Sequence, residues 1–476
     1  MIRCFFLTAS LVLCLAASPL SAGELAIGAA TVSITPNEPV ALSGQLHTRV
    51  AREVESEVTA TALALESRGE GESGDQAILI ACDLVAVRDG IIAKTREKLR
   101  DRLPGFDVSK LIVNATHTHT GPVTREGRYE IPEGVMTVAE YVDFLTDRLA
   151  DVAVQAWESR QPGSVGWGLG HAVIAQNRRS LYANGTAQMY GRTNAATFRG
   201  IEGPEDHGVE VLFFWNGDDE LIATAVNVAC PSQEVEGRSN VNADFWHEVR
   251  ETLRKKHGEQ LHVLGWTGVS GDQSPHLMYR KAAEERMRRL RGLTRLEELA
   301  RRIVRAWEDA YEGARQEMHA DAVLIHKVIE IELPLRPITE DDVAEVKAKI
   351  ESLSGNAKNA VRIGWHREVL HRYAAQQAGT AEPYRMELHA IRLGDIAIAT
   401  NDFELFTQFG IQMKSRSRAL QTFLIQLAGP GTYIPTAVAA AGGGYSAIVE
   451  SNVVGAEGGQ VLTDRTVELI NSLWED

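Results

Sequence analysis

The stretch Leu111–Pro122 reads LIVNATHTHTGP, in which an apolar run leads to two histidines one residue apart before a Gly-Pro pair. The apolar residues predict a buried strand. Alternate residues of a strand share a face, so His117 and His119 should point the same way. Two neutral imidazoles at a strand end can bind a divalent metal together, or one can bind it while the other transfers protons. A histidine pair that only shares a polar rim is the simpler alternative.

The composition bounds the class of protein. The chain has 476 residues, of which 44% are hydrophobic and 24% are charged, and this is typical of a globular protein with one large domain or two smaller ones. The formal net charge of -15 argues against a nucleic-acid partner, because an acidic surface repels phosphates. Only 6% of the residues are aromatic, which also argues against a broad surface for stacking bases.

The N-terminus predicts export. Residues 1–22 contain Arg3, an apolar core and small residues ending at Ala22, which is the pattern of a secretory signal peptide. We therefore expect a secreted or periplasmic protein. The apolar run is short for a membrane span and polar sequence follows it, so no stable span is expected. Cleavage would leave Cys82 and Cys230, which can form one disulfide or stay as free thiols.

The pattern along the mature chain predicts one α/β or α+β domain over residues 23–476, with a large mixed sheet and flanking helices. No internal repeat or long low-complexity linker divides it. Thr339 is an expected helix N-cap, and Leu393, Gly394 and Asp395 are an expected hairpin turn. Strands are expected at 25–36, 58–67, 76–87, 111–117, 163–175, 208–215 and 221–229, helices at 89–103, 137–157, 280–318 and 338–353, and the hairpin at 389–400.

Two further segments carry reactive side chains after expected strands. In GVSGDQSPH (268–276), Ser274 lies on a turn where a hydroxyl can be a nucleophile or an oxyanion donor, although a plain tight turn explains it equally well. In NDFELFTQFG (401–410), Glu404 lies just past a strand, where a carboxylate can reach a metal; taken alone it is a surface acid.

Three other polar residues complete the candidate set. Tyr433 and Tyr445 lie twelve residues apart across a glycine-rich turn. A phenolate can ligate zinc and a phenol can donate to an oxyanion, although tyrosines beside glycines more often only pack. Arg178, in AQNRRS, can orient a polar substrate group, although most such arginines are only solvated.

Together, in this order, these segments resemble the neutral/alkaline (non-lysosomal) ceramidase family, in its N-terminal catalytic domain. The resemblance runs from about residue 25 to the end of the chain. THTHTGP (116–122) is similar to the family's THTHSGP signature, and GDQSP (271–275) to its GD-x-SP motif. The spacing of Glu404 to Gly410 and the spacing of the two tyrosines also match, as do AIGAATVSITP (26–36) and Asp83 in ACDLVAV.

The resemblance implies a zinc-dependent amidohydrolase that cleaves an N-acyl amide, with a ceramide-like sphingolipid among the candidate substrates. It implies zinc (Zn²⁺) ligands and a set of catalytic residues. The implied ligands are His117, Glu404 and Tyr433. His119 would transfer protons, Tyr445 and Arg178 would stabilise the oxyanion or orient the substrate, and Ser274 would be a nucleophile or a residue that shapes the site.

The sequence departs from the family pattern in two places. The strand that normally supplies a second zinc histidine reads NVACPSQEVEG (227–237) and has none. Cys230 and His247 are the substitutes we consider equally, His207 ranks below them, and three protein ligands plus water would also suffice. The chain ends at ELINSLWED, so we expect no C-terminal immunoglobulin-like domain.

Two other classes of function stay open. The same fold can serve a hydrolase or lyase for a different polar substrate, such as a carbohydrate derivative, and a shallow polar cleft would favour it over a long apolar channel. The other is a non-catalytic extracellular binding protein that has lost the metal. Metal analysis would separate it from both enzymes.

Overall fold

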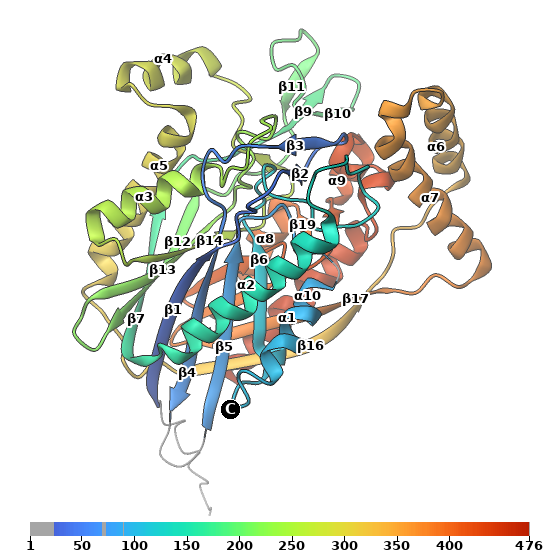
Figure 1. The fold of residues 1–476 in the computed structure, drawn as a ribbon. Helices are drawn as coiled ribbons and strands as arrows, with labels where there is room; N and C mark the ends of the chain where they lie inside the picture. The colour runs from blue at the N-terminus through green and yellow to red at the C-terminus, as the bar shows by residue number, and fades with distance from the viewer. Residues whose placement is uncertain (1–22, 69–72, 89, 476) are drawn as a thin grey trace, which may run out of the picture.

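The computed structural model describes residues 23–68, 73–88 and 90–475, and its centre is a mixed eight-stranded sheet (Figure 1). Its interior pairs are antiparallel, whereas the pair at each edge is parallel. In spatial order the strands are β14 (His262–Thr267), β13 (Leu221–Val228), β12 (Gly208–Asn216), β7 (Gln161–His171), β1 (Glu24–Ser33), β4 (Thr59–Arg68), β5 (Ser73–Cys82) and β6 (Leu111–Ala115).

A second sheet of four strands packs on one face of the first. Its order is β16 (Leu324–Leu333), β17 (Tyr384–Leu393), β18 (Ile396–Thr400) and β20 (Gln421–Ile425), with β18 and β20 parallel. Side chains such as Ile27, Leu63, Ile391 and Phe423 form the core between the sheets. Alternate residues of β5 face this core and the helices outside, which explains its continuous apolar sequence.

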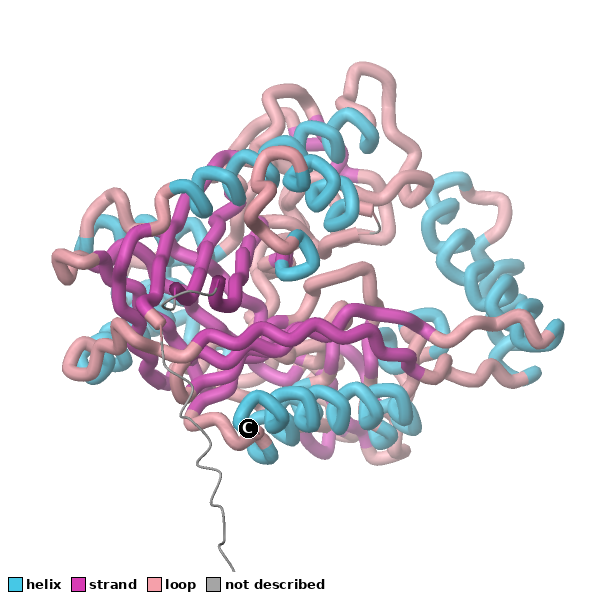
Figure 2. Tube along the Cα trace, turned by 90° about the horizontal axis from the view of Figure 1, so that it is seen from below, coloured by secondary structure: helices cyan, strands magenta, loops and turns pink. Residues whose placement is uncertain are grey.

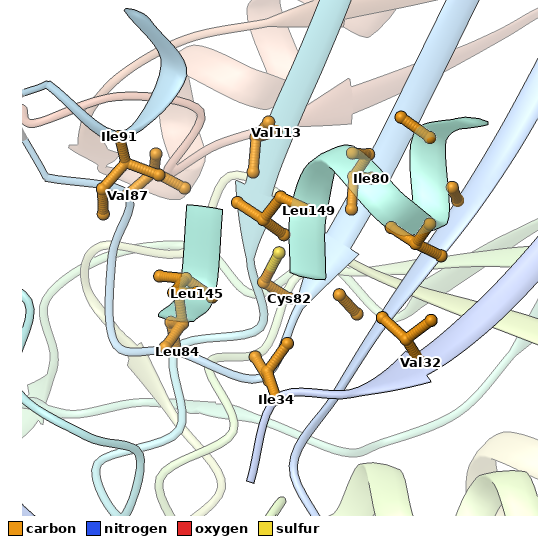
Figure 3. Close-up of a cluster of buried hydrophobic side chains, with 14 of the residues drawn as sticks. Val32, Ile34, Ile80, Cys82, Leu84, Val87, Ile91, Val113, Leu145 and Leu149 are labelled. Carbon is orange, nitrogen blue, oxygen red and sulfur yellow. The ribbon is translucent and has the colours of Figure 1, made fainter. Parts of the chain in front are cut away.

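Helices cover the outer faces of both sheets, so the molecule has four layers (Figure 2). The pair α1 (Ile91–Arg100) and α2 (Val138–Glu158) covers β1, β4 and β5; in Figure 3, Leu145 and Leu149 of α2 lie beside Leu84, Ile80 and Cys82. The other helices in these layers are α3 (Phe245–His257) and α5 (Arg295–Ala314) on β7, β12 and β13, and α8 (Thr407–Arg416) and α10 (Ala456–Asn471) on the small sheet.

The remaining elements lie around the ends of the strands. The helices α6 (Glu340–Leu353) and α7 (Ala360–Ala378) form a pair at one side of the molecule (Figure 1). The short pieces are β2 (Val40–Leu42) with β3 (Arg49–Ala51), β8 (Gln176–Asn177) with β15 (Gln273–Ser274), β19 (Glu404–Leu405) with β21 (Tyr433–Ile434), the sheet of β9 (Arg179–Tyr182), β10 (Ala187–Met189) and β11 (Phe198–Ile201), and the helices α4 (Lys281–Arg291) and α9 (Ala437–Gly442).

The mixed α/β class is confirmed, and one helix prediction is wrong. The predicted helix at 280–318 is two helices, because Gly292 ends α4 in the left-handed conformation (φ 70°) and Thr294 starts α5 with a capping box. The predicted cap at Thr339 is present with Asp342, and the predicted hairpin pairs Leu393 with Ile396.

Two sequence expectations concern thiols and membranes. Cys82 and Cys230 are both buried and free, so the disulfide alternative does not apply. The predicted signal peptide at 1–22 lies outside the described residues. Within the described part of the chain, no helix has the length and apolar character needed to span a bilayer.

Candidate active site

The segment after β6 alternates anchored threonines with histidines that face a cavity. Thr118 and Thr120 are fully buried, and each hydroxyl donates a 2.7 Å hydrogen bond to the Asn242 carbonyl. His117 and His119 line the cavity, with their Nε2 atoms 3.1 Å apart. The strand ends at Ala115, so the strand assumed for the histidines is wrong; they meet because the threonines fix alternate residues.

His117 is held in an unusual backbone conformation. Its φ of 70° lies in the left-handed region that non-glycine residues rarely adopt, and such strain concentrates at functional sites. Its Nδ1 donates to the Val85 carbonyl at 2.6 Å, which leaves Nε2 unprotonated at 3.1 Å from His119 Nε2. Val85 follows β5, and β5 and β6 are parallel, so both segments leave the sheet at the same edge.

Glu404 and Tyr433 reach this edge from the second sheet. They are direct partners in the parallel pair β19–β21, which extends the parallel strands β18 and β20. The Glu404 carboxylate Oε2 lies 3.4 Å from His117 Nε2, and after burial Glu404 is the next cause that raises the pKa of the Tyr433 phenol. Gly271 permits this arrangement, because a Cβ there would overlap the carbonyl oxygen of Glu404.

Tyr445 and Arg178 complete the cluster around Tyr433. The rings of Tyr433 and Tyr445 are 5.8 Å apart and edge to face, and both tyrosines line the cavity. Arg178 is buried, and its Nη2 donates to the Gly271 carbonyl at 2.9 Å and to the Tyr433 hydroxyl at 3.2 Å. Arg178 therefore holds the phenol of Tyr433 from outside the cavity lining.

Burial fixes the protonation of these groups. It lowers the pKa of His117 despite the opposing effect of Glu404. The pKa of His119 lies well below its ordinary value, through burial and then through His117 and nearby arginines. Burial also raises the pKa of Tyr433 well above its ordinary value and that of Tyr445 to about 12. The imidazoles are therefore neutral near pH 7, and the phenols keep their protons to donate.

His119 is oriented by groups that the sequence analysis did not identify. Its Nδ1 lies 3.3 Å from the carboxylate of Glu236, and its carbonyl accepts a 2.5 Å bond from Arg49. Gly44 packs against the ring, since a Cβ there would lie 2.5 Å from His119 Cγ. Glu236 lies in NVACPSQEVEG, the segment searched only for a metal ligand.

Ser274 lies beside the cluster but does not line the cavity. It is on β15, which pairs with β8, and it is fully buried. Its hydroxyl lies 3.0 Å from the Tyr190 hydroxyl, and it accepts bonds from the His276 backbone N–H at 3.1 Å and from Gln233 at 3.4 Å. Tyr190 in turn lies under Arg178, 5.9 Å from ring centre to guanidinium. Ser274 is therefore connected to the cluster through Tyr190 and Arg178.

The three substitutes considered for the missing histidine lie elsewhere. Cys230 packs in an apolar cluster with its sulfur 3.5 Å from the Pro231 carbonyl, and burial raises its thiol pKa well above the ordinary value. His247 is half-buried in the first turn of α3. His207 Nε2 lies 3.2 Å from Glu205. The cavity lining includes none of the three.

The cavity has a volume of about 160 Å³, and much of its wall was missed by the sequence analysis. Arg88, Arg125 and Arg128 follow within a few residues of the motifs ACDLVAV and THTHTGP, so proximity to the motifs was the available signal. Trp365 and Glu450 come from α7 and a turn near the C-terminus, and no local pattern marks them.

The cluster has the donor chemistry of a zinc site. Two ligands on one tetrahedral zinc lie about 3.3 Å apart, and His117 Nε2 and Glu404 Oε2 are 3.4 Å apart. The Nδ1 bond of His117 to a carbonyl is the usual support for a metal-binding imidazole. Over the described residues, no group of three or more His, Cys, Asp or Glu side chains is arranged to hold a metal.

Comparison with known proteins gives matches to solved structures alone. No family model and no curated protein matches the sequence. The crystal structure of neutral ceramidase from Pseudomonas aeruginosa matches with a TM-score of 0.66 and 15% sequence identity, covering 94% of this chain and 74% of that one. A ceramidase complexed with C2 matches with a TM-score of 0.67 and 14% identity, covering 95% and 75%. The protein therefore has the fold of the neutral ceramidases, as its motifs predicted.

Proposed function

We propose that the protein is a secreted or periplasmic, zinc-dependent hydrolase of N-acyl amides. The observation that carries the proposal is the meeting of His117, Glu404 and Tyr433 with Tyr445 in one cavity, from segments that follow four different strands. The fold of the neutral ceramidases and the motifs around these residues support the same reaction type. The N-terminal signal-peptide pattern supports export.

His117, Glu404 and Tyr433 would hold the zinc, with no fourth protein ligand. Three protein ligands and one open position are the arrangement of catalytic zinc sites, and neither Cys230 nor His247 lines the cavity. When bound, zinc would polarise the scissile carbonyl and lower the pKa of a water molecule.

The other residues would handle protons and the developing charge. His119 lines the cavity and would pass a proton to the leaving amine, and the Glu236 carboxylate lies 3.3 Å from its Nδ1. Tyr445 keeps its proton and would donate it in a hydrogen bond to the oxyanion. Arg178 would fix the Tyr433 oxygen through its 3.2 Å bond. Ser274 would shape this wall, because its hydroxyl is buried outside the cavity lining.

Metal analysis of the purified protein tests the proposal. We expect about one zinc per chain, and we expect His117→Ala to lose most of it because two remaining ligands bind weakly. His207→Ala is the matched control, since this histidine pairs with Glu205 outside the cavity. Zinc retained in full by the His117→Ala protein would contradict the ligand assignment, and a metal-free wild type would favour a non-catalytic binding protein.

A second candidate is a hydrolase or lyase of the same fold for a different polar substrate. The observation that favours it is the cavity wall, which includes three arginines and two carboxylates. Zinc content does not separate the two enzymes, whereas cleavage of an N-acyl amide does.

A further inference from the structure

We propose that the substrate carries an oxyanion group, either a carboxylate or a phosphate, and that Arg88, Arg125 and Arg128 bind it. This inference rests on the hydrolase proposed above and specifies its substrate class. A neutral ceramide would leave these charges without a partner.

The three arginines form one side of the reactive cavity. They line it together with His117, Glu404 and Tyr445. Arg88 comes from the segment after β5, and the other two come from the segment after β6, so the parallel strands bring them to the same edge. Burial lowers the pKa of Arg88, Glu404 opposes this, and the charges of Arg125 and Arg128 lower it further.

Arg125 is exposed, whereas Arg88 and Arg128 are half-buried, and all three differ from the buried arginines nearby. Arg179 pairs with Glu202, and Arg250 pairs with Asp83 through two bonds. Within the described ranges, Arg88, Arg125 and Arg128 have no ion pair or side-chain hydrogen bond to a protein group. Glu404 acts on Arg88 at longer range, favouring its charged form.

The charges of the cavity wall do not cancel. The wall has three arginines and two carboxylates, Glu404 and Glu450. Glu450 is already satisfied by Lys349 at 2.9 Å and by His366 at 3.1 Å. The cavity lining therefore has one more cationic arginine than it has carboxylates, in a chain whose formal net charge is -15.

Guanidinium groups recognise carboxylates and phosphates through paired N–H donors, and this is stronger where water is excluded. Three like charges in one partly desolvated wall repel one another, and an anionic ligand would remove that repulsion. The cavity of about 160 Å³ is smaller than the roughly 300–1,000 Å³ of typical ligand pockets.

A matched series of amides tests the inference. N-hexanoylglycine carries a carboxylate, N-hexanoylethanolamine phosphate carries a phosphate, and N-hexanoylethanolamine is neutral. In each, water is consumed, the C–N bond breaks, and hexanoate and a free amine form. With the full zinc-loaded chain we expect kcat/KM at least tenfold higher for one anionic amide than for the neutral one, and the better of the two identifies the oxyanion.

Arginine variants test whether the preference for anionic amides comes from the arginines that line the cavity. Arg88→Gln and Arg128→Gln should each lower the ratio of anionic to neutral kcat/KM about tenfold, since one charged donor is lost. Arg289→Gln, on the exposed surface of α4, should keep the wild-type ratio. Thermal unfolding of each variant checks that it folds.

The outcomes separate this inference from the proposed function. Hydrolysis of the neutral amide as fast as the anionic ones, with ratios unchanged in the variants, would overturn the oxyanion site and leave the amidase standing. No hydrolysis of any amide, but calorimetric binding of N-hexanoylglycine that Arg88→Gln abolishes, would overturn the amidase and keep the anion site. Neither hydrolysis nor binding would overturn both.

Discussion

His117 illustrates how single residues prepare the site. A left-handed conformation costs a non-glycine residue about 1–3 kcal/mol, so neighbouring contacts must maintain it. Thr116 bonds Asp83 at 3.2 Å on one side, and Thr118 bonds the Asn242 carbonyl on the other. The Val85 carbonyl then selects the tautomer in which His117 Nε2 is free to accept. The backbone and the ring are both fixed before any ligand enters.

The first residue-scale prediction concerns Ser274. Ser274→Ala should lower kcat/KM about tenfold to a hundredfold, because Tyr190 loses one partner while Gln233 still bonds it at 2.9 Å. Steady-state kinetics on the amide series measures the loss. A drop of several orders of magnitude, or an acyl-enzyme on Ser274 detected by intact mass, would instead identify a nucleophile.

The second residue-scale prediction concerns how Glu234 makes the stability of the fold depend on pH. Burial raises the pKa of Glu234 to about 7 from 4.5, and its Oε2 is buried with no hydrogen-bond partner in the described structure. A raised pKa means that the folded state favours the protonated acid. The stability that protonated Glu234 contributes is therefore fully present below about pH 4.5 and is lost as pH rises through about 7.

Glu234→Gln should remove this loss of stability at higher pH. Its free energy of unfolding relative to wild type should rise between pH 5 and 8 by on the order of 3 kcal/mol. Urea unfolding across this range measures the difference. Parallel curves for the two proteins would show that burial of Glu234 does not control the slope.

Among the elements, the short pair β19–β21 matters most, because it sets Glu404 and Tyr433 side by side. Each strand is two residues long, and its placement depends on the turn before Gln273. There the Gly271 N–H donates to the Leu405 carbonyl at 2.8 Å. The carboxylate and the phenol therefore share one backbone scaffold.

Gly271→Ala should displace this scaffold. The added Cβ would overlap the Glu404 carbonyl, which cannot move away as a flexible side chain would. We expect a lower melting temperature and reduced zinc content. Gly313→Ala is the control: it lies exposed in α5 with open space around it, and it should leave both values unchanged or slightly raise the melting temperature. Equal behaviour of the two variants would rule out the overlap.

The success of sequence prediction varied with how local each signal was. The helix at 137–157 and the cap at Thr339 were predictable because periodicity and capping residues lie within one element. The break at Gly292 was missed because the apolar and charged pattern continues across it. Of the cavity residues, those inside motifs were identified, whereas Trp365 was not, since only tertiary packing brings α7 to Tyr445.

For the whole molecule, the Asp83–Arg250 pair connects the layers beside the site. Asp83 is fully buried at the end of β5 and accepts 2.6 Å and 3.0 Å bonds from Arg250 of α3. It also accepts from Thr59 at the start of β4 and from Thr116 beside His117. One carboxylate thus ties a helix, two strands and the histidine loop together.

Arg250→Ala should destabilise the protein by about 3–5 kcal/mol, because it leaves a buried carboxylate unpaired. Arg238→Ala, at the exposed pair with Glu55, should cost at most about 1 kcal/mol. Urea unfolding compares both with wild type. Losses of similar size would mean that the buried pair contributes no more than a surface one.

The meeting of the segment after β6 with the segments after β18 and β20 has a consequence for synthesis on the ribosome. The histidines are translated early, whereas Glu404, Tyr433 and Tyr445 emerge near the end. All strands of the large sheet lie between Glu24 and Thr267, so the whole sheet is translated before the carboxylate and the phenols that lie opposite the histidines. Premature termination before β19 would thus release a polypeptide that lacks Glu404, Tyr433 and Tyr445 of the proposed site.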